Sequence, residues 1–183
     1  MAQGTVTLKT SRLTLRKFNI EDAPEMFENW ANDDEVTHYL TWAPHGNVDI
    51  TKEILQAWID QYDNPFTYNW AIVLNETNDL IGNISASKYD PKVKAVCVSF
   101  CEGKDWWGNE YMPEALRAVI SYLVHEENIE RVFVSFDKDN ENSIKTVEKA
   151  EMKKEGVLRK GGFNNQGIVD SIIYSILKDE VTY

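Results

Sequence analysis

The order strand, helix, strand in the second half of the chain restricts its fold more than any other feature. Two apolar segments, AVCVSFC at residues 95–101 and RVFVSFD at residues 131–137, enclose PEALRAVISYLVHEEN at residues 113–128. Apolar side chains recur at helical spacing in the enclosed segment. Two strands joined through a helix run parallel when they are neighbours in one sheet. The sequence therefore predicts one parallel strand pair.

The other segments predict antiparallel strands, because short turns rich in Asn, Asp and Pro separate them. The predicted strands are residues 5–18, 68–75, 80–89, 95–101, 131–137 and a C-terminal hairpin over 155–177 with a flexible tip at 161–167, and the predicted helices are 19–32, 48–62, 113–128 and 140–152. This order predicts an α+β fold with a mixed, mostly antiparallel twisted sheet of about seven strands flanked by about four helices. No linker separates two apolar cores, so residues 1–183 are predicted to form a single domain.

The chain is acidic, with 30 Asp and Glu against 19 Lys and Arg and a formal net charge of -11. Nucleic-acid binding needs clustered cations, so this balance argues against nucleic acid as a partner and fits a cationic one. No apolar run reaches the ~20 residues of a membrane-spanning helix, and the N-terminus has no signal-peptide pattern, which indicates a cytoplasmic protein. Cys97 and Cys101 are ~13 Å apart along one strand, too far for a disulfide within it.

A turn containing Gly108 leads into the helix of the second half, in the stretch DWWGNEYMPEAL at residues 105–116. Pro113 suits the first helical position, because its ring fixes φ and it has no N–H group. The first N–H groups of a helix have no intrahelical acceptor, and with the positive end of the helix dipole they can bind an anion. Every helix has such an end, so this turn alone identifies no ligand.

Two stretches make the chain similar to a known family: WWGNEYMPEALRA at residues 106–118 and NENSIKTVEKAEMKKEGVLR at residues 140–159. With the order of elements, they resemble the GNAT superfamily of N-acetyltransferases, in its RimJ/RimL-like ribosomal-protein acetyltransferase branch. The resemblance spans nearly the whole chain and implies a GNAT-like sheet. It also implies acetyl-CoA as acetyl donor and a primary amine as acceptor, either a protein N-terminus, a basic one included, or a small amine.

The resemblance also implies a set of residues that bind acetyl-CoA. The turn would hold the diphosphate with main-chain amides, the strand before it would pair with the pantetheine arm, and the helix after residue 139 would contact the arm. The implied residues are Val98, Ser99, Phe100, Trp107, Gly108, Asn109, Glu110, Tyr111, Met112, Asn140 and Ser143. Ser143 is the candidate catalytic acid for the departing thiolate. Asn140 and Ser143 also suit the start of a helix, so capping alone is an alternative reading.

The acceptor would bind near an aromatic stretch between the first two helices. The candidate residues are Tyr39, Trp42, His45, Trp70 and Asn83. Packing over the core is the alternative for these aromatic side chains. The histidines show no metal-ligand spacing, so no metal is predicted. The exposed C-terminal hairpin is a candidate surface for a homodimer.

Three of the positions that depart from the family pattern bear on CoA binding or catalysis. Glu110 stands where relatives have a second glycine, Cys97 where many have an acidic residue, and Val147 where other members have a tyrosine acid. A carboxylate facing the diphosphate would weaken CoA binding, whereas one facing solvent would not. These departures support an alternative function, a catalytically impaired regulatory or interaction module with weak or no CoA binding.

Overall fold

A single eight-stranded sheet organises the structure, a computed structural model that describes residues 2–183 and all their side chains except those of residues 88 and 89. The strands are β1 (Leu8–Lys9), β2 (Leu13–Arg16), β3 (Tyr68–Leu74), β4 (Leu80–Asp90), β5 (Ala95–Glu102), β6 (Arg131–Asp137), β7 (Lys153–Asn164) and β8 (Gly167–Leu177). Their spatial order is β1-β2-β3-β4-β5-β6-β8-β7. The mixed, mostly antiparallel α+β fold predicted from the sequence is therefore confirmed.

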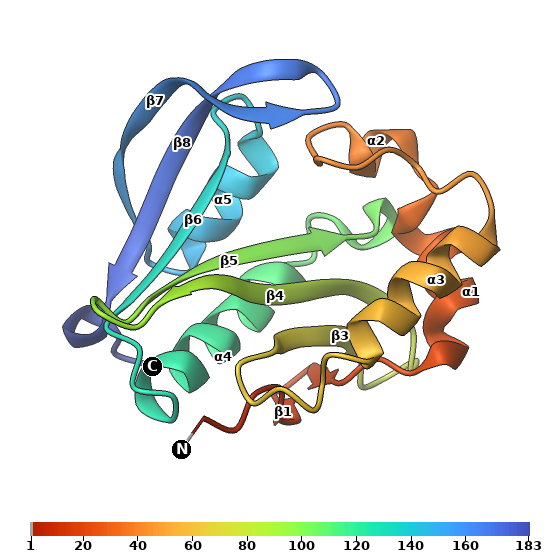
Figure 1. The fold of residues 1–183 in the computed structure, drawn as a ribbon, viewed down its shortest axis with the longest axis horizontal. Coiled ribbons are helices and arrows are strands. Elements are labelled where there is room, and N and C mark those ends of the chain that lie inside the picture. Colours follow the sequence, from red (N-terminus) through yellow and green to blue (C-terminus); the bar gives the residue numbers. More distant parts are fainter. Residues whose placement is uncertain (1) are drawn as a thin grey trace.

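Helices cover both faces of the sheet (Figure 1). They are α1 (Ala23–Met26), α2 (Asp34–Thr37), α3 (Val48–Ile59), α4 (Tyr111–His125) and α5 (Glu141–Lys149), with a π-helical turn at Phe27–Ala31 and 3-10 turns at Ile20–Asp22, Lys104–Trp106 and Lys178–Glu180. The apolar stripe of α4 packs with α5 on one face, and α1 and α3 pack on the other. We call the face of α1 and α3 the front face.

The first predicted strand is in fact two strands, which is why the sheet has eight. Thr10 interrupts it, because its N–H donates to the Leu13 carbonyl at 2.9 Å and turns the chain back. Leu8 then pairs with Leu15 in an antiparallel ladder. Alternating hydrophobicity predicts extended backbone well, but a short side-chain-assisted turn inside such a run is invisible to it.

The predicted parallel pair is present and lies near the centre of the sheet. β5 and β6 pair only from Ala95–Cys97 to Arg131–Phe133. Beyond this register the two strands diverge toward the upper right of Figure 1, and β6 instead pairs along its whole length with β8. From Val98 onward, the edge of β5 that faces away from β4 therefore has no strand beside it within the described chain.

The C-terminal hairpin reaches across to α2 with its tip. Strand β7 continues to Asn164, so the tip is shorter than the predicted residues 161–167. Asn165 docks on α2 and the segment after it: its Nδ2 donates to the carbonyls of Thr37 and Trp42 at 2.8 Å. The tip is thus held in place by polar contacts. No helix in the described part of the chain is long and apolar enough to cross a membrane.

Candidate active site

The turn before α4 adopts a conformation that glycine usually provides. Gly108 has φ +82 and Glu110 has φ +65, so both are left-handed. The helix begins at Tyr111, two residues earlier than predicted, with Glu110 as its N-cap. Pro113 is accordingly the third helical residue, a position where an N–H would also lack an intrahelical acceptor. A left-handed glutamate costs about 1 kcal/mol relative to glycine.

Several main-chain amides of this turn are unpaired. Within residues 2–183, the N–H groups of Gly108, Glu110 and Tyr111 have no hydrogen-bond acceptor. Trp107 and Asn109 use theirs inside the turn, donating to the carbonyls of Lys104 and Trp106. The helix N-terminus thus presents three free donors, and it can bind an anion there.

The carbonyls of the turn are held by Arg12, a residue distant in sequence that lies just before β2. Its Nη1 donates to the Asn109 carbonyl at 2.9 Å and its Nη2 to the Glu110 carbonyl at 3.2 Å. Its guanidinium also lies 4.6 Å from the centre of the Tyr111 ring. Because a peptide's C=O and N–H point in opposite directions, holding the carbonyls on one side orients the following amides toward the other.

Glu114, on the first turn of α4, fixes Arg12 in turn. Its Oε2 accepts from Arg12 Nε at 2.6 Å and its Oε1 from the Arg12 main-chain N–H at 3.0 Å. Burial acts to raise the pKa of Glu114, but hydrogen bonds from Thr10 and Arg12 hold it below its ordinary value. The carboxylate is therefore charged at neutral pH and keeps the guanidinium fork in register.

The Glu110 side chain turns toward α5. Its Oε1 forms an ion pair with Lys149 Nζ on the last turn of that helix. Both side chains are about half exposed, at 53% and 49%, so the pair adds little to stability. The ion pair matters because it orients the Glu110 carboxylate and holds it beside α5.

A second carboxylate, Glu102, lies beneath the turn at the end of β5. Its Oε1 is shielded from solvent and has no hydrogen-bond partner in the described structure. Burial raises the pKa of Glu102 to about 8, an effect that the nearby N–H of Met112 opposes. No sequence pattern indicated a role for Glu102, because a single glutamate at a strand end is usually exposed.

Glu102→Gln should reduce the loss of stability that occurs as pH rises. The folded chain keeps the Glu102 proton up to about pH 8, while the unfolded chain loses it near 4.5, so the free energy of unfolding falls across that window. Urea titrations at about pH 5 and about pH 9 should show a smaller fall for the variant than for the wild type. Glu110→Gln, at an exposed position, is the matched control. Parallel losses in wild type and Glu102→Gln would contradict the assignment.

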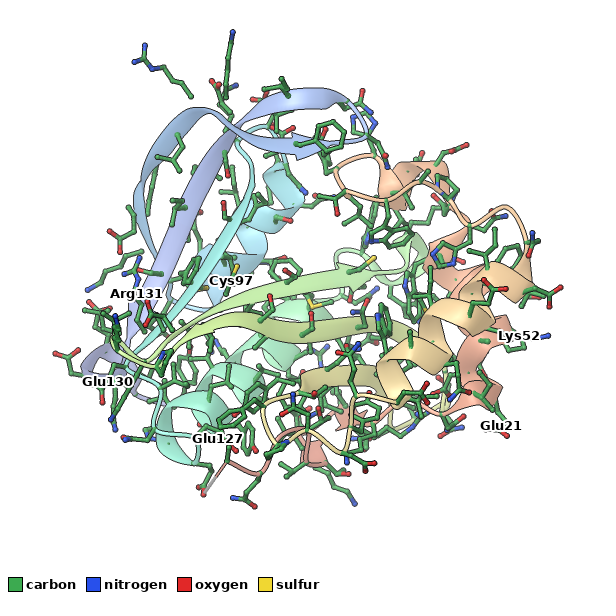
Figure 2. The ribbon with its side chains drawn as sticks, in the orientation of Figure 1. Glu21, Lys52, Cys97, Glu127, Glu130 and Arg131 are labelled. Carbon is green, nitrogen blue, oxygen red and sulfur yellow. The ribbon has the colours of Figure 1, made fainter. Side chains whose placement is uncertain are left out.

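The free edge of β5 begins where its pairing with β6 ends. Cys97, labelled in Figure 2, is buried at the closed end of this divergence. The two cysteines form no disulfide, as predicted. The side chains of Val98 and Phe100 pack on the α4 side, whereas Ser99 is exposed on the front face. The three candidate arm-binding residues therefore present an unpaired strand edge.

The start of α5 is capped by Asn140. Its Oδ1 accepts from the Ser143 N–H at 3.1 Å, so the predicted capping role is confirmed. The Ser143 hydroxyl is partly buried and makes no hydrogen bond within the described residues. Val147 lies one turn further on and is fully buried against the core, where it takes no part in proton transfer.

The candidate acceptor residues do not converge on one site. Tyr39 reaches across to the segment before α5, and its hydroxyl donates to the Asp139 carbonyl at 3.2 Å. Trp42 packs over the front-face core and contacts His45, with ring centroids 5.0 Å apart. His45 is buried, its Nδ1 lies 2.7 Å from Thr51 Oγ1, and burial lowers its pKa. His45 therefore packs in the core instead of lining a groove.

The prediction for Trp70 is wrong. Trp70 is fully buried on the α4 side, where its Nε1 donates to the Val6 carbonyl at 2.7 Å. Every residue of β3 is buried, because helices cover both faces of the sheet at this strand. Alternation of polar and apolar residues therefore does not indicate which face of the sheet each side chain of β3 lies on. Asn83 lies on the front face, where it lines a groove beside α3. Among the described residues, no cluster of three His, Cys, Asp or Glu side chains could hold a metal ion.

Comparison with known proteins agrees with this arrangement. Residues 12–153 match the profile of the Acetyltransferase (GNAT) domain. The N-acetyltransferase p20 of Bacillus licheniformis, named as uncharacterized, is 29% identical over 174 residues, which are 95% of this chain and 97% of that protein. YoaA of Bacillus subtilis, named in the same way, is 29% identical over 171 residues, which are 93% of this chain and 96% of that protein.

Solved structures share the fold. The ribosomal-protein-S5-alanine acetyltransferase of Vibrio fischeri has a TM-score of 0.83 at 19% identity, covering 97% of this chain and 100% of that one. RimL, a ribosomal L7/L12 α-N-protein acetyltransferase solved with coenzyme A, also has a TM-score of 0.83, at 18% identity, covering 94% of this chain and 98% of that one. At such identities the likeness shows the fold alone.

Proposed function

The chain belongs to the GNAT acetyltransferase domain family, and from this premise we propose that it transfers the acetyl group of acetyl-CoA to a primary amine. One observation carries the proposal. The unpaired edge of β5 leads directly to a turn with three free amides, and Trp107 joins the two by donating from Nε1 to the Glu102 carbonyl at 2.8 Å. Acetyl-CoA has an extended, amide-bearing pantetheine chain that matches the strand edge, and a diphosphate that matches the free amides of the turn.

Each part of the donor has chemistry to match it. The main chain of Val98–Phe100 can pair with the amides of pantetheine as a sheet edge pairs with an added strand. The N–H groups of Gly108, Glu110 and Tyr111 can donate to the diphosphate at the positive end of the α4 dipole. Met112, whose amide is also predicted to contact the diphosphate, has its N–H near Glu102.

The reaction requires a neutral amine placed against the thioester carbonyl. A C–N bond forms, the C–S bond breaks, the amine loses one proton, and the thiolate gains one. Ser143 is the proposed proton donor to the thiolate, since its hydroxyl is unengaged on the first turn of α5. Cys97 is buried and Val147 carries no proton, so we assign the amine's proton to solvent.

Ser143→Ala should slow acetyl transfer by about tenfold and leave acetyl-CoA affinity nearly unchanged. The expected effect lies below the ~10²–10⁴ of a typical general acid, because a thiolate is a stable leaving group. Thiol release from acetyl-CoA across a panel of amines and peptides measures turnover, and calorimetry measures affinity. Turnover equal to that of the wild type would remove Ser143 from the mechanism.

The second candidate is a non-catalytic module that keeps the fold. The Glu110 carboxylate at the turn favours it, because its negative charge opposes a diphosphate. Calorimetry separates the two functions. Micromolar acetyl-CoA binding by the wild type supports the transferase, and no binding by the wild type, with binding restored in Glu110→Gly, supports the module.

A further inference from the structure

A groove on the front face of the sheet lies away from the turn. It has a volume of about 370 Å³ and lies between the end of α3 and strands β3 and β4. Its lining includes Trp58, Asn69, Asn83, Ser85 and Ser87. None of the described lining residues carries a formal charge, although the chain as a whole has a net charge of -11. The described lining is therefore polar and neutral, rich in amide and hydroxyl groups.

Asn69 is an unsatisfied polar residue in this groove. It is only 8% exposed, and its Oδ1 has no hydrogen-bond partner in the described structure. Its main chain is fixed, because its N–H donates to Thr5 Oγ1 at 2.9 Å and its carbonyl accepts from the Tyr62 hydroxyl at 2.8 Å. Buried polar atoms without partners are rare in native proteins, and each one calls for an explanation. A ligand that bonds to the side-chain amide would supply the missing partner.

A row of polar side chains connects the groove to the free edge of β5. Asn69 is the register partner of Ser85, and Ser85 is the register partner of Ser99. Their sequence neighbours pack on the α4 side, so these three side chains share the front face. Two strand spacings make the row about 10 Å long. The row ends at the free edge of β5, which is proposed to pair with the pantetheine arm.

We infer that the groove binds an uncharged, amide-bearing tail of the acceptor, with Asn69 pairing with one tail amide about 10 Å from the reacting nitrogen. This inference rests on the proposed function and refines its acceptor. A basic tail is disfavoured here, because an ammonium group would lose water without gaining a counter-ion. An amide tail gains both a donor and an acceptor from one asparagine.

Three acceptors that differ only in the tail test this inference: alaninamide, tetra-alanine amide, and the same tetrapeptide amide with lysine at positions three and four. Tetra-alanine amide should shift the side-chain NMR signal of Asn69, and alaninamide should not. In steady-state assays the KM for tetra-alanine amide should be about tenfold lower than for the other two, with kcat little changed, as expected for one added hydrogen bond.

Asn69→Ala should raise the KM for tetra-alanine amide about tenfold and leave that for alaninamide unchanged. Ser85→Ala is a second variant in the same row and keeps the test decisive if the first fails to fold. The inference would be overturned if the Asn69 signal did not shift, or if KM were the same for all three acceptors and for both variants. Turnover of alaninamide in that case would still support the proposed transferase function. Absence of acetyl-CoA binding with a shifted Asn69 signal would instead overturn the proposed function.

Discussion

Arg12→Ala should weaken acetyl-CoA binding by about ten- to a hundredfold. The guanidinium satisfies the carbonyls of Asn109 and Glu110 and so sets the direction of the amides that follow them. Hydrogen bonds from a charged donor contribute about 1.5–3 kcal/mol each, and a tenfold change in Kd corresponds to about 1.4 kcal/mol. Without Arg12, the left-handed turn has fewer restraints and its free amides diverge.

Calorimetry with acetyl-CoA, combined with thermal unfolding, separates positioning from general stability. Arg12→Lys keeps the charge but loses the planar fork, so its affinity should lie between wild type and Arg12→Ala. Arg16→Ala is the matched control, because Arg16 is a nearby arginine on β2 that pairs with Asp22 through two 2.8 Å hydrogen bonds instead of with the turn. A lower Tm with unchanged Kd in Arg12→Ala would reduce Arg12 to a structural role.

The contrast between β5 and β3 shows how far a sequence predicts this fold. The strand–helix–strand order required a parallel pair, and β5 with β6 forms it. These strands diverge after Cys97 because β6 pairs with β8 along its whole length. This pairing joins segments that are far apart in the sequence, so local sequence patterns do not predict it. In β3 every position is buried, so alternation could not place Trp70 on the correct face.

The candidate site was predictable only where its parts are local in sequence. The Gly108 turn and the Asn140 cap are each contained in a few residues, and local rules identify them. Arg12 acts across 97 residues of chain, and Lys149 acts on Glu110 across 39. Neither contact leaves a periodic or motif signal. The role of Glu102 depends on burial beneath the turn, which is a property of the folded chain.

The direction of the Glu110 carboxylate decides between the two candidate functions. Lys149 holds it beside α5, but an ion pair between half-exposed side chains is weak and sensitive to salt. Like charges about 4 Å apart repel by about 1 kcal/mol in water and about 4 kcal/mol at an effective dielectric constant of 20. The contribution of Lys149 to acetyl-CoA affinity therefore depends on how strongly it keeps the Glu110 carboxylate away from the diphosphate.

Lys149→Ala should weaken acetyl-CoA binding at low salt by about ten- to a hundredfold, because the released carboxylate can approach the diphosphate. The same substitution in a Glu110→Gln background should have almost no effect, since no charge is left to restrain. Calorimetry on this four-protein cycle measures the coupling directly. An equal loss in both backgrounds would mean that Lys149 contacts the phosphates itself. In that case the glutamate at the turn is tolerated for a reason other than its ion pair.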